Sequence, residues 1–291
     1  MPELSRLPYL PRRWWTIGVP GLLERQWATY WPLDLDDMPA AMPGFEGTLD
    51  WLLNAPVHDR SLEKGPDDPA ERDANAAGLE AIASSAPFPS AFRRFIRDPE
   101  PRRHIRSATA CYLDLAHFPV QLSDGGILVH FLSDQQWVLH WLLYVSSEGA
   151  EAVLASPDPL GFDDGENEPV HFVDIATAPH ELTVCADSFE EFLYRFWAEN
   201  ELFFRLAVDE VSLDGLPAAL RAYALAYPAD EAQSTNRSRD LIYYGRPGSV
   251  GEHHAVAWAR PCENGEASAP PVVPRPLACD GLRDAARGGP S

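Results

Sequence analysis

The segment from residue 127 to residue 150, ILVHFLSDQQWVLHWLLYVSSEGA, constrains the fold more than any other. Two apolar runs are separated by the polar residues SDQQ (133–136), and the second run ends at SSEG (146–149). Apolar runs of this length between turn residues are typical of buried β-strands joined as hairpins. In the second run both alternating sets of side chains are mostly apolar, which predicts a central strand that is covered on both faces.

Helical patterns precede and follow these strands. Apolar residues recur at helical spacing in residues 88–98, and a capping box of Ser188 and Glu191 precedes a wide apolar stripe that begins at residue 189. Composition and spacing predict further elements, namely helices over 20–30, 69–86 and 217–227, strands over 108–116, 151–156 and 170–176, and a strand pair in 241–259.

Six stretches follow one another in a specific order, namely PSAFRRF (89–95), GILVHF (126–131) with the following DQQ, then Trp141, AVLA (152–155), SFEEFL (188–193) and FWAENE (196–201). In these residues and in their order the chain resembles the SUKH superfamily. The resemblance covers about half the chain, and both ends lack a counterpart. It implies an α+β fold, with a mostly antiparallel (mixed) sheet of five or six strands and helices packed around it.

The resemblance places a SUKH-like core at residues 87–231 and implies a function class. The aromatic content of residues 1–86 predicts a helical extension that packs on this core, and the composition of residues 232–291 predicts a C-terminal extension that is largely disordered from about residue 262. Most SUKH proteins are bacterial immunity proteins that bind and neutralise a toxin, often a nuclease or deaminase, and others are intracellular scaffolds.

The polar segment between the two strands allows two interpretations. Asp134 is a good turn former because its short side chain can bond the backbone two residues further on. The segment can also contact a partner through Gln135, Gln136 and Trp137, because glutamine offers neutral donors and acceptors that suit the centre of an interface. Both interpretations can hold together, and we include all four residues in the predicted partner-binding surface.

Acidic residues supply the rest of that predicted surface. The loop DPLGFDDGENE (158–168) is the most acidic short segment, and a loop between strands is suited to binding a basic partner. Glu199 and Asn200 are either part of a solvated helix face or contacts to the sheet or to a cationic partner. The acidic loop and this helix contribute Asp158, Asp163, Asp164, Glu166, Glu168, Glu199 and Asn200 to the predicted surface. Structural roles are predicted for Trp141, Ser188, Phe189, Glu191, Phe192 and Trp197.

Motifs for catalysis or metal binding do not stand out in the sequence. It has no GxSxG elbow, no phosphate-binding loop, and no HxH or HExxH pair. His130 and His140 lie on the two predicted strands, but a four-residue loop over 133–136 would place them on opposite faces, and only a loop of odd length would bring them together. We therefore expect no catalytic residues, no metal and no cofactor.

Charge and cysteine content narrow the class of partner. The chain has 44 acidic and 23 basic residues, a net charge of −21. Six of the acidic and seven of the basic residues lie from residue 232 onward, which leaves 38 against 16, or −22, in residues 1–231. Such a field repels nucleic acid and anionic lipid and attracts a basic partner, although ordinary solubility also explains it.

The expected location is the cytoplasm. Cys111, Cys185, Cys262 and Cys279 are too far apart for a disulfide framework, and neither a signal peptide nor an apolar run of membrane-spanning length is evident. The sequence thus predicts a non-catalytic protein-binding module, an immunity protein of a toxin–antitoxin type that occludes a basic toxin. The alternatives are an intracellular regulatory scaffold and a hydrolase with its site in the terminal extensions.

Overall fold

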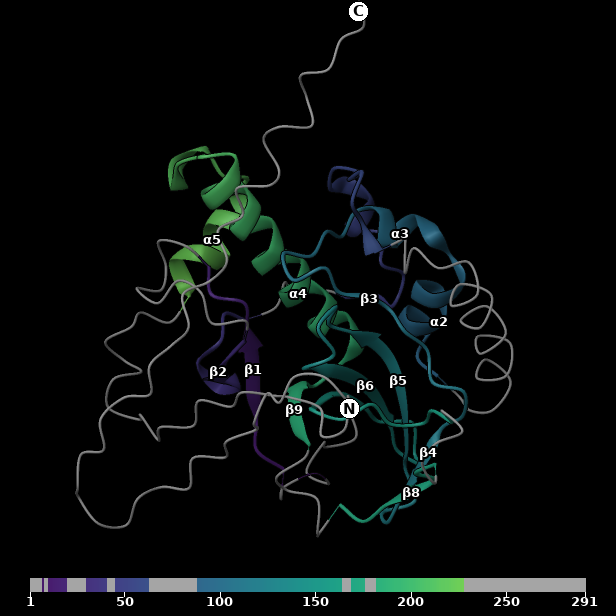
Figure 1. The fold of residues 1–291 in the computed structure, drawn as a ribbon. Helices are drawn as coiled ribbons and strands as arrows, with labels where there is room; N and C mark the ends of the chain where they lie inside the picture. Colours follow the sequence, from purple (N-terminus) through teal and green to yellow (C-terminus); the bar gives the residue numbers. More distant parts are fainter. Residues whose placement is uncertain are drawn as a thin grey trace, which may run out of the picture.

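The computed structural model describes residues 7, 10–19, 30–40, 45–62, 88–163, 169–175 and 182–227. Within them the chain has an α+β fold, a mixed seven-stranded sheet with helices packed around it, which confirms the predicted class (Figure 1). The expected helix over 69–86, nearly all of that over 20–30, the strand pair after residue 240 and the C-terminal extension lie outside the described residues. No described helix is long and apolar enough to cross a membrane.

The main sheet has the strand order β8-β4-β5-β6-β7-β9, and β3 also pairs with β5. All pairings are antiparallel except that of β4 with β8. The central position predicted for the second apolar run is confirmed, because β6 lies between β5 and β7 and all its residues are buried. The strands are β3 (Tyr112–Leu113), β4 (Val120–Leu122), β5 (Ile127–Ser133), β6 (His140–Val145), β7 (Glu151–Ser156), β8 (Phe172–Val173) and β9 (Thr183–Ala186).

A register shift in β5 decides which side chains share a face of the sheet. Ser133 pairs with His140, but His130 pairs with Leu142, so Phe131 is the extra residue of a β-bulge. Because side chains alternate along a strand, one extra residue moves everything before it to the other face. His130 therefore lies on the same face as Ser133 and His140.

This register corrects the prediction that the two histidines face opposite ways. The loop between β5 and β6 comprises six residues, 134–139, rather than the four that the sequence suggested. A six-residue loop alone would still separate the histidines. The bulge has the effect that a loop of odd length would have had, because it changes the register by one residue.

Helix α4 begins where the capping box of the sequence marks its start. Ser188 Oγ accepts a hydrogen bond from Glu191 N (3.2 Å), as the capping box predicts, whereas the Glu191 carboxylate accepts one from Asp187 N (3.0 Å) instead of from Ser188 N. The helices are α2 (Ser90–Arg97), α3 (Pro99–Arg103), α4 (Phe189–Phe203) and α5 (Ala218–Ala226), with a π-helical turn, η4 (Phe204–Val208), directly after α4 and 3₁₀ turns η1 (Leu35–Asp37), η2 (Leu52–Asn54) and η5 (Leu213–Gly215).

An aromatic core joins the helices to the sheet. Phe131 makes edge-on contacts with Phe92 of α2 at 5.8 Å and with Phe189 and Phe192 of α4 at 5.3 Å and 5.6 Å. Trp141 of β6 extends the cluster toward the C-terminal half of α4. Edge-on aromatic pairs add packing energy beyond their buried area, so the bulged residue is anchored by both helices.

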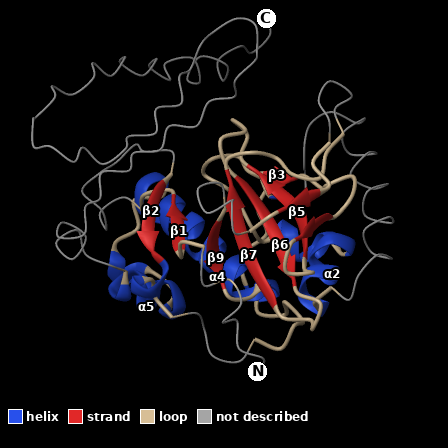
Figure 2. Cartoon of the chain, turned by 90° about the horizontal axis from the view of Figure 1, so that it is seen from below, coloured by secondary structure: helices blue, strands red, loops and turns tan. Residues whose placement is uncertain are grey.

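The described part of residues 1–86 packs against this core. Strands β1 (Arg13–Thr16) and β2 (Trp31–Asp34) form a ribbon beside β9, where Val184 N donates to Pro11 O at 2.8 Å (Figure 2). The Trp14 ring lies 5.8 Å from that of Phe192. In Figure 1 this ribbon and α5 lie on one side of the fold, and α2 and α3 lie on the other.

The aromatic core makes a direct prediction about stability. Phe92→Ala removes a fully buried ring and should lower the free energy of unfolding by about 3–5 kcal/mol. The matched control is Leu225→Ala in α5, because Leu225 is 70% exposed and its loss should change the free energy by less than about 0.5 kcal/mol. Urea denaturation followed by tryptophan fluorescence measures both, and equal midpoints would contradict this description of the core.

Candidate functional site

A buried polar cluster lies at the end of the β5–β6 hairpin, on the sheet face away from Phe131 and α4. Its centre is the hydroxyl of Ser133, which donates a hydrogen bond to Asp114 Oδ2 at 2.6 Å. The same oxygen lies 2.8 Å from His130 Nε2 and 2.8 Å from His140 Nδ1. All four residues are buried, so three ionisable side chains converge on one hydroxyl inside the protein.

The chain positions Asp114 through the same bulge. The segment after β3 continues along β5, where Asp114 N donates to Phe131 O (3.1 Å) and Ala116 N donates to His130 O (3.1 Å). The backbone carbonyl of Phe131, the bulged residue, therefore accepts a hydrogen bond from the backbone N–H of Asp114. Three separate stretches of the chain, each held by backbone hydrogen bonds, supply the cluster.

The hydrogen bonds define the protonation of both imidazoles. A serine hydroxyl has one proton and two lone pairs, and this proton is donated to Asp114. The two imidazole nitrogens must then be donors, so His130 carries its proton on Nε2 and His140 carries one on Nδ1. Burial, with a smaller contribution from neighbouring His140, lowers the pKa of His130 well below its usual value, so this imidazole is neutral.

The cluster does not have the order of a catalytic triad. In a triad the histidine lies between the nucleophile and the carboxylate, takes the proton of the serine and is oriented by the acid. Here Ser133 donates directly to Asp114, and the serine has no solvent exposure through which a substrate could reach it. This geometry therefore does not place Ser133 as the nucleophile of a hydrolase.

The donor atoms could hold a metal ion. One ligand atom from each of Asp114, His130 and His140 lies within 4.8 Å of the other two. Two imidazoles and a carboxylate are among the donor sets that Zn²⁺ takes in proteins. The expectation that the histidines could not share a ligand set depended on the wrong register.

Aromatic rings cover the cluster. Trp137 lies edge-on to His140 with ring centres 5.6 Å apart, and Phe162 lies edge-on to His130 at 4.7 Å. Trp137 Nε1 also donates a hydrogen bond to the hydroxyl of Tyr112. The predicted turn and the acidic loop thus each cover one histidine of the polar cluster with an aromatic side chain.

The predicted binding residues of the turn separate into buried and exposed positions. Asp134 is fully buried, and its carboxylate accepts hydrogen bonds from Gln136 N (2.9 Å) and Tyr30 OH (2.9 Å). This confirms its predicted role as a turn former and corrects its assignment to the partner-binding surface. Gln135, Gln136 and Trp137 are exposed, as that assignment requires.

Two residues of the acidic loop can be placed. Asp158 and Asp163 are exposed, whereas Asp164, Glu166 and Glu168 lie outside the described residues. Because Ser156 of β7 pairs with His140 of β6, the loop leaves the sheet at the same end as the turn. The turn and Asp158 therefore lie at one end of the sheet, whereas Asp163 lies farther along the loop, where its N–H donates to His117 Nδ1 at 3.4 Å.

Glu199 lies inside the protein, which corrects its predicted place on the binding surface. Its Oε1 accepts hydrogen bonds from Trp14 Nε1 (2.6 Å) and Tyr227 OH (2.7 Å), and Tyr227 OH also bonds to Thr16 Oγ1 (2.6 Å). Burial raises the pKa of Glu199 to about 7, against the opposing effect of these hydrogen bonds. No local pattern indicated this, because the partners come from both ends of the described chain.

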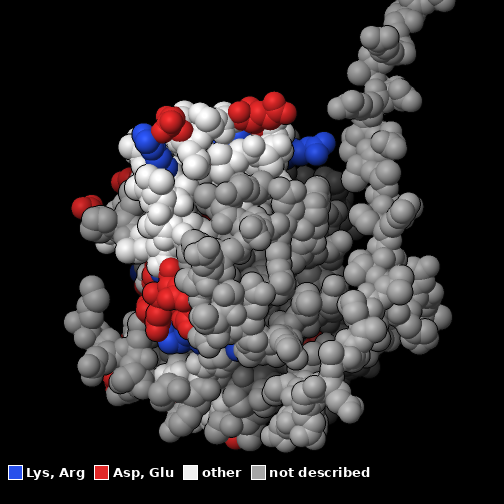
Figure 3. Space-filling model, turned by 90° about the vertical axis from the view of Figure 1, so that its left-hand side faces the viewer, with Lys and Arg blue, Asp and Glu red and all other residues white. Residues whose placement is uncertain are grey.

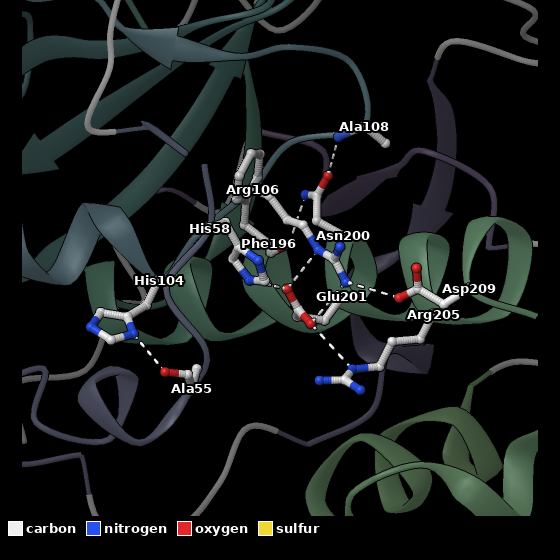
Figure 4. A network of polar contacts seen from close by, with 10 residues as sticks. All are labelled: Ala55, His58, His104, Arg106, Ala108, Phe196, Asn200, Glu201, Arg205 and Asp209. Carbon is white, nitrogen blue, oxygen red and sulfur yellow. Dashed lines mark hydrogen bonds and ion pairs between the residues drawn. The ribbon is translucent and has the colours of Figure 1, made fainter. Parts of the chain in front are cut away.

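Asn200 and its neighbour Glu201 are also buried, and Figure 4 shows the polar contacts that they make. Asn200 accepts from Ala108 N (2.7 Å) and donates to Phe196 O (2.8 Å), which corrects its assignment to the binding surface. Glu201, which sequence reasoning missed, accepts from Arg106 Nε (2.8 Å) and lies 2.7 Å from His58 Nε2. The sequence did hold one signal for Glu201, because Arg205 follows it by four residues, the spacing of a helical ion pair. Arg205 Nε donates to the Glu201 carboxylate at 3.3 Å.

The residues predicted to be structural lie in the core or at the cap of α4. The rings of Phe189 and Phe192 are fully buried, and the ring of Trp197 is half-buried against Trp51. The set comprises Trp141, Ser188, Phe189, Glu191, Phe192 and Trp197.

Comparison with known proteins gives no relative. No protein-family model matches the chain, and neither a curated protein nor a solved structure matches it significantly. The SUKH resemblance and the function it implies therefore stay predictions.

The buried carboxyl of Glu199 predicts a pH dependence of stability. Its pKa is about 7 in the folded state against 4.5 in the unfolded state, so the folded protein holds a proton that the unfolded chain releases. The contribution of Glu199 to the free energy of unfolding is full below the pKa of the unfolded state and is lost as pH rises through the pKa of the folded state. Relative to Glu199→Gln, which keeps the acceptor oxygen and does not titrate, the wild-type protein should lose roughly 2–3 kcal/mol between about pH 5 and pH 8.

Urea denaturation of both proteins across this range measures the difference. A wild-type curve that runs parallel to that of Glu199→Gln would show that Glu199 has the same pKa in the folded and unfolded states, contrary to the structure.

Proposed function

We propose that the protein is a non-catalytic binding module that occludes a basic protein partner with the sheet end formed by the 134–139 turn and the acidic loop. The observation that carries the proposal is the exposed indole of Trp137. The SUKH resemblance makes an immunity protein that neutralises a toxin the favoured biological role. The mechanism needs no covalent chemistry, because a toxin whose active site is covered by the module is inhibited.

Trp137 has the properties of an interface anchor. Its side chain is 36% exposed, and its backbone has a positive φ of 56°, a region that residues other than glycine seldom adopt. Such strain persists only where the surroundings impose it, and it is concentrated at functional sites. The ring is held by His140 and Tyr112, so little side-chain freedom is lost when a partner covers it. Tryptophan is also enriched among the residues that dominate binding energy.

The neighbours of Trp137 suit a polar rim. Gln135 and Gln136 are exposed and carry neutral donors and acceptors, which can be desolvated at less expense than charges. Asp158 and Asp163 stand on the loop that leaves the same end of the sheet. Acidic side chains at the edge of an interface accelerate the approach of a basic partner.

The charge of the whole chain favours the same class of partner. A net charge of −21 attracts a basic protein over distances that salt shortens. Figure 3 shows the face with α5 and β2, where groups of acidic side chains stand beside basic ones. Arg12 with Asp187 (2.7 Å) and Arg221 with Asp214 (2.7 Å) are ion pairs of this kind, in which the acid is already compensated.

Affinity capture tests the proposal. Tagged full-length protein is recovered from its own cells at low and at moderate salt, and co-purifying proteins are identified by mass spectrometry. We expect one basic protein that is retained at low salt and weakened as salt rises. The purified partner should bind the Trp137→Ala variant about 30-fold more weakly than it binds the wild-type protein. This ratio corresponds to a loss of about 2 kcal/mol in binding free energy, as at a hot-spot residue.

The matched control is Phe172→Ala. Phe172 is also an exposed aromatic residue, but β8 pairs with β4, which pairs with the end of β5 that is remote from the turn. This variant should bind as the wild-type protein does, and one equivalent of wild-type protein should inhibit the enzymatic activity of the partner. Binding that is insensitive to Trp137→Ala, or a partner that is not basic, would contradict the proposal.

A further inference from the structure

The polar cluster beneath the turn has the spacing of a metal site. Asp114 Oδ2 and His130 Nε2 are 3.6 Å apart. Two ligand atoms of a tetrahedral zinc site are about 3.4 Å apart, because zinc–ligand bonds are about 2.0–2.2 Å long. One ligand atom from each of Asp114, His130 and His140 lies within 4.8 Å of the other two. A small inward movement of three side chains is enough to bind an ion.

The three side chains are already directed at a common point. Each donor atom lies 2.6 to 2.8 Å from the hydroxyl oxygen of Ser133, which occupies the centre of the group. A strand serine can adopt more than one χ1 rotamer, so this hydroxyl can turn away from the centre and leave room for an ion. The imidazoles would then bind through the nitrogens that now donate to Ser133.

The surroundings also suit a bound ion. Backbone pairing fixes Asp114, His130 and His140 on three neighbouring segments. Phe162 and Trp137 pack on the imidazoles and exclude water, which strengthens coordination. The side chain of Asp114 is 12% exposed, which provides a path from solvent.

We propose that Asp114, His130 and His140 form a binding site for one transition-metal ion of the Zn²⁺ type, with the fourth position taken by water. The donor set determines the class of metal, because two imidazoles favour Zn²⁺, Co²⁺, Ni²⁺ or Cu²⁺, whereas Ca²⁺ and Mg²⁺ prefer oxygen ligands. The ion would join β5, β6 and the segment after β3 directly beneath Trp137. This site does not depend on the proposed partner, and either inference can fail without the other.

Cobalt titration of the full-length protein tests this site. Protein treated with a chelator and dialysed is titrated with Co²⁺, whose visible absorption bands are intense in tetrahedral coordination, and Zn²⁺ is then added to displace it. We expect saturation at one equivalent, loss of the bands with Zn²⁺, and a rise in the unfolding temperature with either ion. Absence of saturable binding to the folded wild-type protein overturns the proposal.

Four variants locate the bound ion. Asp114→Asn and His140→Gln each remove a ligand and should weaken binding by more than about 100-fold, since losing even a residue that only orients a ligand weakens it 10- to 100-fold. Ser133→Ala should retain binding, because it frees the centre and keeps all three ligands. His171→Gln is the matched control, since His171 is exposed and stacks on Phe118 instead.

The pattern across the variants is decisive. Binding that survives both Asp114→Asn and His140→Gln resides elsewhere in the chain and overturns the assignment. Loss of binding in folded Ser133→Ala overturns it too, because the hydroxyl would then be required. Near-ultraviolet circular dichroism shows whether each variant is folded. If His140→Gln does not fold, metal binding by Asp114→Asn alone decides whether the ion binds at this site.

Discussion

The β-bulge at Phe131 determines the environment on both faces of the central sheet. On one face the extra residue inserts its ring between α2 and α4, where Phe92, Phe189 and Phe192 enclose it. On the other face the same extra residue brings His130 to the side of Ser133 and His140. A single backbone irregularity thus anchors the aromatic core and assembles the polar cluster.

Helix α4 contacts several separate parts of the fold. Its apolar side meets the sheet, and three consecutive polar residues, Glu199, Asn200 and Glu201, are each buried against a different part of the chain. Glu199 reaches the N-terminal ribbon and Tyr227, Asn200 reaches the segment before β3, and Glu201 reaches Arg106. Consecutive helical residues point about 100° apart, so a helix surrounded on most sides needs partners in each direction. These three polar residues form hydrogen bonds inside the protein rather than being presented to a partner.

Sequence periodicity predicted the elements whose pattern is local. The apolar runs correspond to β5, β6 and β7, and the spacing of Ser188 and Glu191 predicted the start of α4. The bulge could not be predicted, because Phe131 lies in an unbroken apolar run and only tertiary packing shows that it is the extra residue. The histidine cluster was missed for the same reason. Burial of Glu199 and Asn200 depends on residues far away in the chain, and the two short strands β4 and β9 contain too few residues for periodicity to reveal them.

The convergence of both imidazoles on one hydroxyl is the central claim, and long-range ¹⁵N–¹H NMR of the histidine rings tests it most directly. In metal-free protein, His130 should carry its proton on Nε2 and His140 should carry a proton on Nδ1, because the only proton of Ser133 is donated to Asp114. This outcome would establish the register that the bulge imposes. An unprotonated nitrogen at either position would contradict the hydrogen-bonded cluster and, with it, the account of the hairpin.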